Sequence, residues 1–306
     1  MRSRSALARL QQATTLGSLL CAAAWLLWRW DDSRVTAWVG FFLITMGYSV
    51  VLAIEFITLR FAGRSDPAPQ PTWPELGRAW VAETVAAPRV FCWRQPFRWR
   101  EVPDMLEVPP GAASRRGAVF VHGFVCNRGF WIPWLMRMRD LGHPFLAVNL
   151  EPVFGSIEAY VPIIEDAVER MTKATGLPPV LVCHSMGGLA ARAWLCARSA
   201  GHRVHHVVTI ASPHHGTWLG QFSHLENGRQ MRLRGPWIQE LLQSGDPALN
   251  CRFTCWYTNC DNIVFPASTA TLPGADNRLV VGVAHVELAF HRKVMDETLA
   301  KITGKD

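Results

Sequence analysis

The chain has 306 residues, of which 49% are hydrophobic, and its formal net charge is +7. This length suits one large domain with additions, or two small domains. The basic residues are scattered among tryptophan and acidic residues rather than gathered in runs. This argues against nucleic-acid binding and favours a basic surface that faces anionic lipid headgroups. The eight cysteines follow no regular framework and show no zinc-type C-x-x-C spacing, so we expect reduced thiols.

Two apolar runs lie near the start of the chain. We predict one transmembrane helix over about residues 13–30 and a longer one over about 35–59, in which Glu55 is the single charged residue. The second run is long enough to cross a bilayer, and the first is slightly short. Together they predict an N-terminal membrane anchor over residues 1–60. Two other interpretations are a signal peptide for the first run, and a buried helical hairpin of a soluble protein.

Charge around the two runs predicts their orientation. The loop between them is balanced, with two arginines against two aspartates, whereas arginines flank the pair on both sides. The flanking arginines are Arg2, Arg4, Arg9, Arg60, Arg64 and Arg78. Because cytoplasmic segments carry an excess of positive charge, we expect both ends of the pair in the cytoplasm and only the loop outside.

A connecting region separates the apolar pair from the rest of the chain. Residues 61–89 begin with a proline-rich stretch that is typical of a stiff, extended linker. Over residues 73–87 the mixture of Trp, Val, Glu and Arg predicts a short helix, which suits the membrane surface and the edge of a domain equally well. Residues 90–99 alternate loosely and predict an added edge strand. We expect the main domain to cover residues 90–306.

From residue 117 onward, strand-like and helix-like segments alternate along the chain. Repeated β-then-α order predicts a parallel sheet with helices on both faces, and in such sheets the active site lies beyond the carboxyl ends of the strands. The expected strands are residues 118–121, 144–150, 180–182, 207–211, 253–257 and 279–283, and the expected helices are about 130–141, 157–175, 186–200 and 286–302.

The segment 178–195, PPVLVCHSMGGLAARAWL, organises the rest of the chain. A β-branched apolar run passes through Cys-His-Ser-Met-Gly-Gly into an Ala- and Leu-rich helical pattern. A serine on a sharp strand-to-helix turn, with small residues two before and two after it, is the nucleophile elbow of an α/β-hydrolase. This pattern predicts Ser185 as the nucleophile. Cys183 replaces the first glycine of the usual G-x-S-x-G pattern, and it is small enough for a close-packed turn.

A serine nucleophile needs a base within hydrogen-bonding reach and a carboxylate that orients the base. In α/β-hydrolases these residues follow in the order serine, acid, histidine. Among eleven histidines, His285 stands out because it follows the last expected strand and precedes the closing helix. For the acid, Asp261 lies in the loop TNCDNIVFP after the strand 253–257. Asp276 and Asp246 are the competing candidates.

An oxyanion hole requires two backbone amides aimed at one point. The amide of Met186, directly after the nucleophile, is expected to be the first. The second is expected from the loop His122-Gly123-Phe124, which closes the strand 118–121. Gly123 lets the backbone bend so that the amide of Phe124 can face the serine.

Three stretches, VFVHGF, VCHSMGG and TIASPHHGT, together resemble bacterial triacylglycerol lipases and related lipase-like α/β-hydrolases, including the inositol deacylases that act on lipid anchors. The resemblance covers about residues 118–294 and leaves the first hundred residues outside it. It implies an α/β-hydrolase fold and a serine esterase. Within it, Ser185 matches the nucleophile and HGF the oxyanion loop, whereas Asp261 and His285 match by order and context only.

Residues 218–245 interrupt the β/α alternation and carry few strand signals. Their length suits a cap or lid over the site, with Trp218, Phe222, Trp237 and Leu241 as substrate-binding residues of its apolar lining. A lid that excludes water strengthens the electrostatic interactions inside a site. An ordinary excursion of packed helices is the alternative.

These motifs predict a membrane-anchored serine hydrolase that cleaves carboxylic esters of lipids or other apolar acyl substrates through an acyl-enzyme. We expect a multi-pass protein of the bacterial inner membrane, with its hydrolase domain in the cytoplasm. Its expected partners are the acyl-ester substrate and membrane lipids, with neither cofactor nor metal. The catalytic residues do not specify the leaving group, so a thioesterase or amidase acting on a lipid-modified substrate is an alternative. A catalytically silent, membrane-tethered interaction domain is another.

Overall fold

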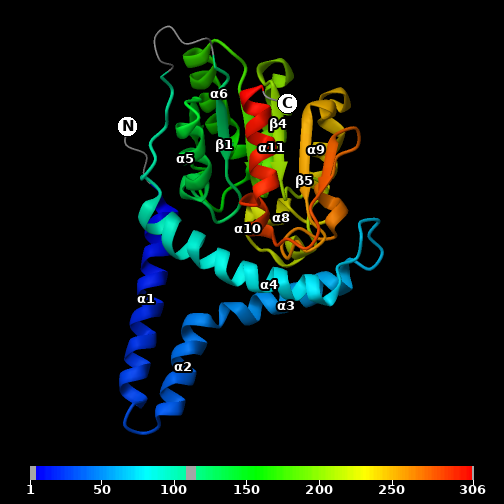
Figure 1. Ribbon diagram of the computed structural model, residues 1–306. Coiled ribbons are helices and arrows are strands. Elements are labelled where there is room, and N and C mark those ends of the chain that lie inside the picture. The colour runs from blue at the N-terminus through cyan, green and yellow to red at the C-terminus, as the bar shows by residue number, and fades with distance from the viewer. Residues whose placement is uncertain (1–4, 108–114, 305–306) are drawn as a thin grey trace.

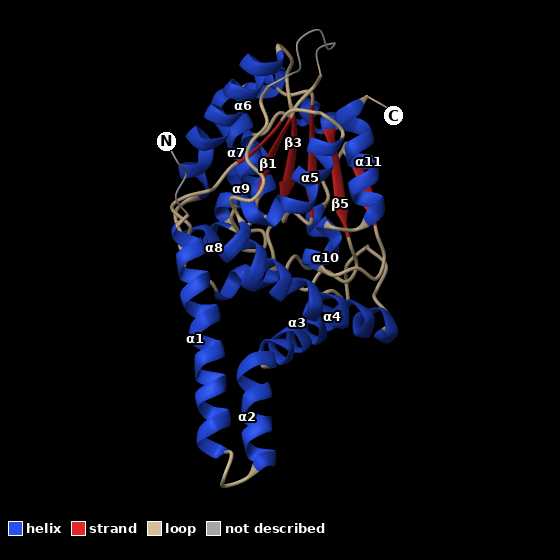
Figure 2. Cartoon of the chain, turned by 60° about the vertical axis from the view of Figure 1, so that its left-hand side comes forward, coloured by secondary structure: helices blue, strands red, loops and turns tan. Residues whose placement is uncertain are grey.

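The computed structural model describes residues 5–107 and 115–304. An α/β domain carries a projecting pair of helices, and two further helices lie across the base of the domain (Figures 1 and 2). Two of the flanking arginines, Arg2 and Arg4, lie outside the described residues.

Six parallel strands form one sheet in the order β2-β1-β3-β4-β5-β6. The first three strands are completely buried, as expected of parallel strands that are covered on both faces and read as continuous apolar runs. The predicted parallel sheet is therefore confirmed. The strands are β1 (Ala118–Val121), β2 (Phe145–Ala147), β3 (Val180–His184), β4 (His206–Ile210), β5 (Phe253–Tyr257) and β6 (Asp276–Leu279).

Helices cover both faces of the sheet (Figure 1). Alternate residues of one strand face different cores, so Phe120 packs on one side and Val119 on the other. On the side of Phe120 lie α5 (Ile132–Asp140), α10 (His285–Ala289) and α11 (Arg292–Thr303), and on the side of Val119 lie α6 (Val161–Thr175), α7 (Met186–Arg198) and α9 (Pro236–Ser244). Shorter helices connect these elements: η2 (Arg128–Trp131), η3 (Ile157–Tyr160), η4 (Ala200–Arg203), η5 (Trp218–Phe222), α8 (Glu226–Gln230), η6 (Pro247–Arg252) and η7 (Ala267–Ala270).

The predicted edge strand over residues 90–99 is wrong. The predicted helix before it is present as α4 (Trp73–Pro88), and this helix runs directly into a wider π-helical segment, η1 (Arg89–Arg98). The first turns of the N-terminal helix pack on η1, where Gln12 donates a hydrogen bond to the carbonyl of Pro96 (2.6 Å). Val90 of this segment packs in the core beside the sheet, whereas Trp93 and Phe97 are exposed, so the segment is a helix in contact with α1 and not an edge strand.

The C-terminal segment also differs from its prediction: the strand expected over residues 279–283 lies at Asp276–Leu279, and the single helix expected over residues 286–302 is two helices. β6 ends at Leu279, three residues before Gly282, which has a φ of 75° and turns the chain. The closing helix is divided into α10 and α11, because Phe290 leaves the helical conformation between them. His285 is consequently the first residue of a short helix of its own.

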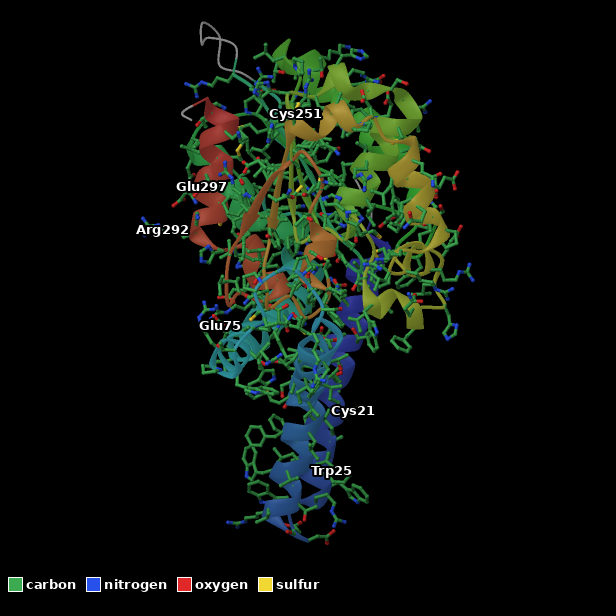
Figure 3. All side chains as sticks on the ribbon, turned by 90° about the vertical axis from the view of Figure 1, so that its right-hand side faces the viewer. Cys21, Trp25, Glu75, Cys251, Arg292 and Glu297 are labelled. Atoms are coloured by element: carbon green, nitrogen blue, oxygen red, sulfur yellow. The ribbon has the colours of Figure 1, made fainter. Side chains whose placement is uncertain are left out.

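The N-terminal arm consists of α1 (Ala6–Arg29), α2 (Arg34–Met46) and α3 (Tyr48–Ala62). The helices α1 and α2 form a projecting hairpin, on which Figure 3 labels Cys21 and Trp25. Within the described residues, α1 is the one helix that is by itself long and apolar enough to cross a membrane. The helices α2 and α3 are long enough only when taken together, and the chain bends by 55° between them. The second predicted helix is thus not one straight span, and a hairpin across a membrane is not confirmed.

The helices α3 and α4 lie side by side across the base of the domain (Figure 1). Phe56 and Leu59 of α3 and Leu76 of α4 are buried in one apolar cluster with Cys260 and Phe265. The last two residues belong to the loop after β5, at the edge where the parallel strands have their carboxyl ends. The N-terminal helices therefore cover the edge of the sheet at which a site is expected.

Candidate active site

Ser185 lies on a strained turn between β3 and α7. Its φ of 54° and ψ of −128° are unusual for a residue with a side chain. Close packing leaves no room for larger residues just after it. A Cβ at Gly187 would lie 2.4 Å from the carbonyl oxygen of Val121, and one at Gly188 would lie 2.3 Å from Oγ of Ser212. The neighbouring strands therefore require the small residues of the motif.

Cys183 stands where the usual motif has its first glycine. Its side chain is fully buried in the apolar core that β3 shares with α6 and α7. Burial raises the pKa of the thiol, so the group is protonated and unreactive at neutral pH. A small apolar side chain is accommodated at this position, and the turn at Ser185 forms without the glycine.

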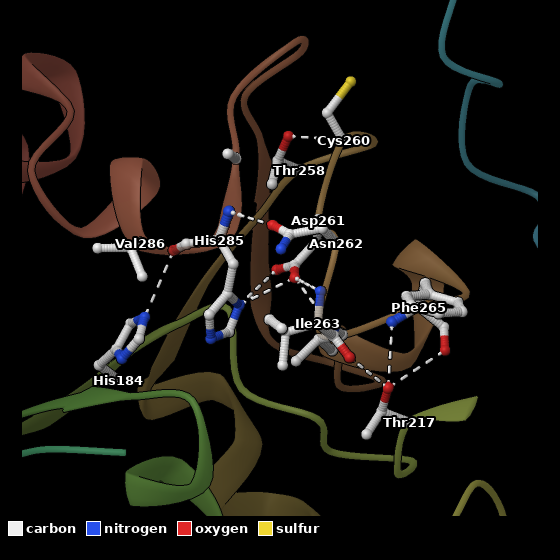
Figure 4. A network of polar contacts seen from close by, with 12 residues as sticks. His184, Thr217, Thr258, Cys260, Asp261, Asn262, Ile263, Phe265, His285 and Val286 are labelled. Carbon is white, nitrogen blue, oxygen red and sulfur yellow. Dashed lines mark hydrogen bonds and ion pairs between the residues drawn. The ribbon is translucent and has the colours of Figure 1, made fainter. Parts of the chain in front are cut away.

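Asp261 and His285 are brought together from the loop after β5 and the start of α10 (Figure 4). Nδ1 of His285 lies 2.9 Å and 3.1 Å from the two carboxylate oxygens of Asp261. Oδ1 of Asp261 also accepts hydrogen bonds from the amides of Ile263 (3.0 Å) and Val264 (2.7 Å). The loop backbone thus fixes the carboxylate, and the carboxylate orients the imidazole so that Nε2 is left to exchange a proton.

The pKa of His285 is raised above its ordinary value although the side chain is buried. Burial alone would lower this pKa, but the carboxylate of Asp261 outweighs that effect, and Glu83 and Glu55 add to it. The imidazolium is therefore stabilised, as a base that must carry a proton transiently requires.

His184, the residue before Ser185, contacts His285. The ring of His184 stacks on Phe130, with centroids 4.4 Å apart, and lies 4.7 Å from the ring of His285. Burial, together with the charge of His285, holds the pKa of His184 well below its usual value, so this ring is neutral. In the described chain the hydroxyl of Ser185 makes no hydrogen bond to the imidazole. Such bonds are often long in free enzymes and shorten when substrate binds.

The loop after β1 lies directly against the serine. A Cβ on Gly123 would lie 2.7 Å from Cβ of Ser185, so this close approach depends on glycine. His122 secures the loop, since its Nδ1 lies 2.9 Å from the carbonyl oxygen of Gly123 and its Nε2 accepts from the amide of Leu150 (3.0 Å). Burial lowers the pKa of His122 to about 4, which keeps the ring neutral and able to accept that bond.

The two amides predicted for the oxyanion hole are available. Met186 opens α7, so its amide is one of the helix N-terminal groups that lack an intrahelical acceptor. Phe124 follows the loop glycine. Among the described residues, neither amide donates to another protein group. Both can therefore donate to a negatively charged oxygen beside Ser185.

The competing acids lie in other contacts. Asp276 belongs to β6 and pairs with Arg278 (2.6 Å), and Asp246 accepts from a backbone amide at the start of η6 (2.9 Å). Within the described residues neither carboxylate contacts His285. No group of three or more His, Cys, Asp and Glu side chains in this part of the chain is arranged to hold a metal.

The residues predicted to line the lid lie in two separate parts of the structure, one beside the loop of Asp261 and the other on α9. Trp218 and Phe222 contact each other, with ring centroids 4.7 Å apart, and Trp218 stacks on Phe265 of the loop that carries the acid. Trp237 and Leu241 belong to α9, which packs on α7. Leu241 is a buried core residue and not part of an open lining, because the apolar face of α9 covers α7. The predicted lining is therefore wrong for Leu241, and a lid over residues 218–245 stays a prediction.

The sequence interpretation missed the contribution of the N-terminal helices. Asn262 donates to Glu55 of α3 (2.7 Å), and the amides of Val286 and Glu287 donate to Glu83 of α4 (3.0 and 3.2 Å). Glu55 carried a signal, since an isolated carboxylate in a long apolar run usually has a function. Glu83 carried a weaker sequence signal of the same kind, because it is an acidic residue in a mostly apolar stretch of helix.

Comparisons with known proteins agree with this fold. The model of the alpha/beta hydrolase family matches residues 118–289, more than half of the chain. The chain therefore belongs to the alpha/beta hydrolase family. A comparison with curated protein sequences finds no match.

Solved structures of lipases share the fold. The mature form of Bacillus licheniformis lipase BlEst2 superposes with a TM-score of 0.57 at 16% identity, covering 64% of this chain and 95% of that chain. Its propeptide form gives a TM-score of 0.56 at 16% identity, covering 64% and 52%. Aspergillus fumigatus lipase B gives 0.46 at 17% identity, covering 58% and 47%. Identities this low establish similarity of fold alone.

We expect Gly187→Ala to lower the free energy of unfolding by about 2 kcal/mol, because overpacking against fixed backbone is destabilising. The added Cβ would meet the carbonyl oxygens of Val121 and His122, which the sheet holds in place. The matched control is Gly77→Ala in α4, where nothing lies within 4 Å of the added Cβ. Alanine there should stabilise the helix. Chemical unfolding of the full-length protein in detergent measures both, and equal stability of the two variants would contradict the packing argument.

We expect Asp261→Asn to lower the pKa of His285, because burial then acts without the opposing carboxylate. With that negative charge gone, the imidazolium is less stable and the ring loses its proton at lower pH. An NMR titration of histidine-labelled, full-length protein measures the shift, with His285→Asn to assign the resonance. Asp276→Asn is the matched control and should leave the pKa of His285 unchanged. An unchanged titration of His285 in Asp261→Asn would refute the electrostatic role of the carboxylate.

Proposed function

We propose that this protein is a membrane-anchored serine hydrolase that cleaves carboxylic esters of lipids or other apolar acyl substrates. The observation that carries the proposal is the buried Asp261–His285 pair, with 2.9 Å between Nδ1 and Oδ1, beside the end of the strand that bears Ser185. A serine on a tight turn without such a pair would be only a packing feature. The order serine, acid, histidine along the chain supports the same conclusion.

In the proposed reaction, Nε2 of His285 accepts the proton of Ser185 while the serine oxygen attacks the carbonyl carbon of the ester. Asp261 keeps Nδ1 protonated and stabilises the imidazolium. The amides of Phe124 and Met186 stabilise the negative charge that develops on the carbonyl oxygen. The imidazolium then donates its proton to the leaving alcohol. Water, deprotonated by the same histidine, finally releases the acid from the acyl-enzyme.

The raised pKa of His285 determines the pH dependence of this reaction. The imidazole must be neutral to accept the proton of Ser185, so the rate falls as pH falls through the pKa of the base. Because this pKa lies above the ordinary value of 6.5, the loss of activity on the acidic side should begin at a higher pH than for an unperturbed histidine.

An apolar acyl substrate suits the surroundings of the site. BlEst2, which shares the fold, is named a lipase, and this supports an ester as the bond cleaved here. Trp218 and Phe222 lie beside the loop of Asp261 and offer apolar surface to an acyl chain. Trp237 packs on a different part of the domain, and its role in substrate binding rests on the sequence pattern alone. The chemistry proposed needs neither a cofactor nor a metal.

The N-terminal arm supports attachment to a membrane. The amide of Ala6, at the start of α1, donates to Glu151 of the domain (3.0 Å), and α3 packs on the domain after α2. Both ends of the projecting hairpin therefore lie against the hydrolase domain. Large apolar side chains remain exposed along the hairpin, such as Leu20 (70%) and Val35 (74%). A hairpin that enters the bacterial inner membrane from the cytoplasmic side, where the flanking arginines favour the domain, accounts for these features.

A fluorophosphonate probe tests the nucleophile. We expect the wild type to be labelled, and Ser185→Ala to lose both the label and hydrolysis of a medium-chain p-nitrophenyl ester, by about 10³-fold or more. The matched control is Ser244→Ala, at an exposed serine of α9, which should retain both. A folded wild type that takes up no label, or labelling that persists in Ser185→Ala, would refute the assignment.

Flotation with vesicles of bacterial phospholipids tests the anchor. We expect the double variant Leu16→Asp/Leu20→Asp to float far less than the wild type, because each charge placed in the bilayer costs about 3 kcal/mol. The matched control is Met136→Asp/Leu141→Asp, at side chains of the hydrolase domain that are 39% and 40% exposed. It should float like the wild type. Equal flotation of the two double variants would count against insertion of α1.

A further inference from the structure

Glu83 is a buried carboxylate in a helix that lies outside the sheet. It belongs to α4, and its side chain is only 2% exposed. Leu76 and Ala79, on the preceding turns, are buried in the apolar cluster beneath the domain. A carboxylate in such surroundings is costly unless polar groups compensate it. Its partners therefore indicate why it is there.

Both oxygens of Glu83 accept hydrogen bonds from the first turn of α10. Oε1 accepts from the amide of Val286 (3.0 Å) and Oε2 from the amide of Glu287 (3.2 Å). These are the amides that follow His285, the first residue of α10. The residue before the helix, Ala284, has no polar side chain to cap it, so Glu83 supplies from α4 what an N-cap side chain normally supplies. The orientation of α10, and of His285 with it, thus depends on a different helix.

The acid is connected to the N-terminal helices in the same way. Asn262, the neighbour of Asp261, donates to Glu55 of α3 (2.7 Å), and its own side-chain oxygen accepts from the amide of His285 (3.4 Å). Figure 4 shows Asn262 beside both Asp261 and His285. Cys260 and Ala284, which precede the acid and the base, are packed in the apolar cluster with α3 and α4.

Titratable groups from four elements face His285. They are Asp261 from the loop after β5, His184 from the end of β3, Glu55 from α3 and Glu83 from α4. Three of the four are carboxyl groups, and His184 is neutral. Glu287, whose amide donates to Glu83, pairs through its own carboxylate with Arg78 (3.1 Å).

Opposing effects act on the pKa of the Glu83 carboxyl group. Burial raises its pKa to about 7, while the charge of His285 and the two amide hydrogen bonds act in the opposite direction. The ionised form can accept from both amides and stabilises positive charge on the imidazole. The neutral form accepts less strongly from the two amides and stabilises positive charge on the imidazole less.

We propose that Glu83 is a positioning residue for His285: from the helix beside the membrane anchor, it holds the turn that carries the base and stabilises the imidazolium that forms when Ser185 is deprotonated. The catalytic part of this inference rests on the proposed serine hydrolase function. The structural part, that Glu83 acts on the ionisation of His285, does not require that function. By this inference α3, which ends the predicted anchor, and α4, which lies beside it, both contribute to the active site.

The test uses the full-length protein in detergent and the variants Glu83→Gln and Glu83→Asp. The matched control is Glu240→Gln, at an exposed position of α9. We expect Glu83→Gln to lower the pKa of His285 in the histidine NMR titration and to move the acidic limb of the kcat–pH profile to lower pH. We also expect kcat to fall roughly ten- to a hundredfold, as for a slightly misplaced catalytic group. Glu83→Asp should recover part of each change, and Glu240→Gln should alter none.

Two results would overturn the proposal. The first is a folded Glu83→Gln whose His285 titration and kcat both match those of the wild type. The second is a loss of kcat with a lowered melting temperature but with the His285 titration unchanged, which indicates a purely structural residue. If Glu83→Gln does not fold, Glu83→Asp decides: a shift of the His285 titration in the same direction supports the proposal, and an unchanged titration overturns it.

Failure of this proposal can be told apart from failure of the proposed function. A wild type that takes up no fluorophosphonate, but whose His285 titration still responds to Glu83→Gln, refutes the hydrolase and leaves the positioning role. A wild type that is labelled and cleaves esters, but whose His285 does not respond, refutes the positioning role alone.

Discussion

Two buried ionisable side chains, Asp261 and His285, hold each other in place at the carboxyl edge of the sheet. An unpaired charge in the interior costs several kcal/mol, so the positive charge on His285 depends on the carboxylate of Asp261 beside it. Their hydrogen bond (2.9 Å) joins the loop after β5 to the start of α10. It therefore fixes the chain after β5 against the chain after β6. It also fixes the position of the imidazole, which the hydroxyl of Ser185 must reach in the proposed reaction.

The other half of the site consists of backbone that approaches unusually closely. Gly123 lies against Ser185, and Gly187 lies against the carbonyl oxygens of β1 and the loop after it. The same close approach that strains the serine also leaves the amides of Phe124 and Met186 without protein acceptors. The proposed nucleophile and the proposed oxyanion donors are thus two consequences of packing β1, β3 and α7 closely together. This explains why small residues recur in the motif, and why Cys183 is tolerated where only core packing is required.

The strands and the candidate triad were predictable because their signals are local. Buried parallel strands are short β-branched runs, and Ser185 lies in a pattern that few other turns require. The packing of the N-terminal helices was not predictable, because an apolar run has the same composition whether it faces lipid or another helix. The amides that bind Glu83 are about two hundred residues away in the sequence. Residues 90–99 alternate as a strand would, yet they form the helical segment η1, which packs on α1, and no local pattern distinguishes these two cases.

The helix α3 has two apolar surfaces with different neighbours. Phe56 and Leu59 are buried against the loops that carry the acid and the base, whereas Ile54 and Ile57 are exposed. In the proposed hydrolase, a single layer of helices thus separates the catalytic edge from the bilayer. An acyl chain that reaches Ser185 from the lipid must pass this layer, and moving the layer would also withdraw Glu55 and Glu83 from Asn262 and α10. Access to the site and the geometry of its base are therefore coupled, because the same helices determine both.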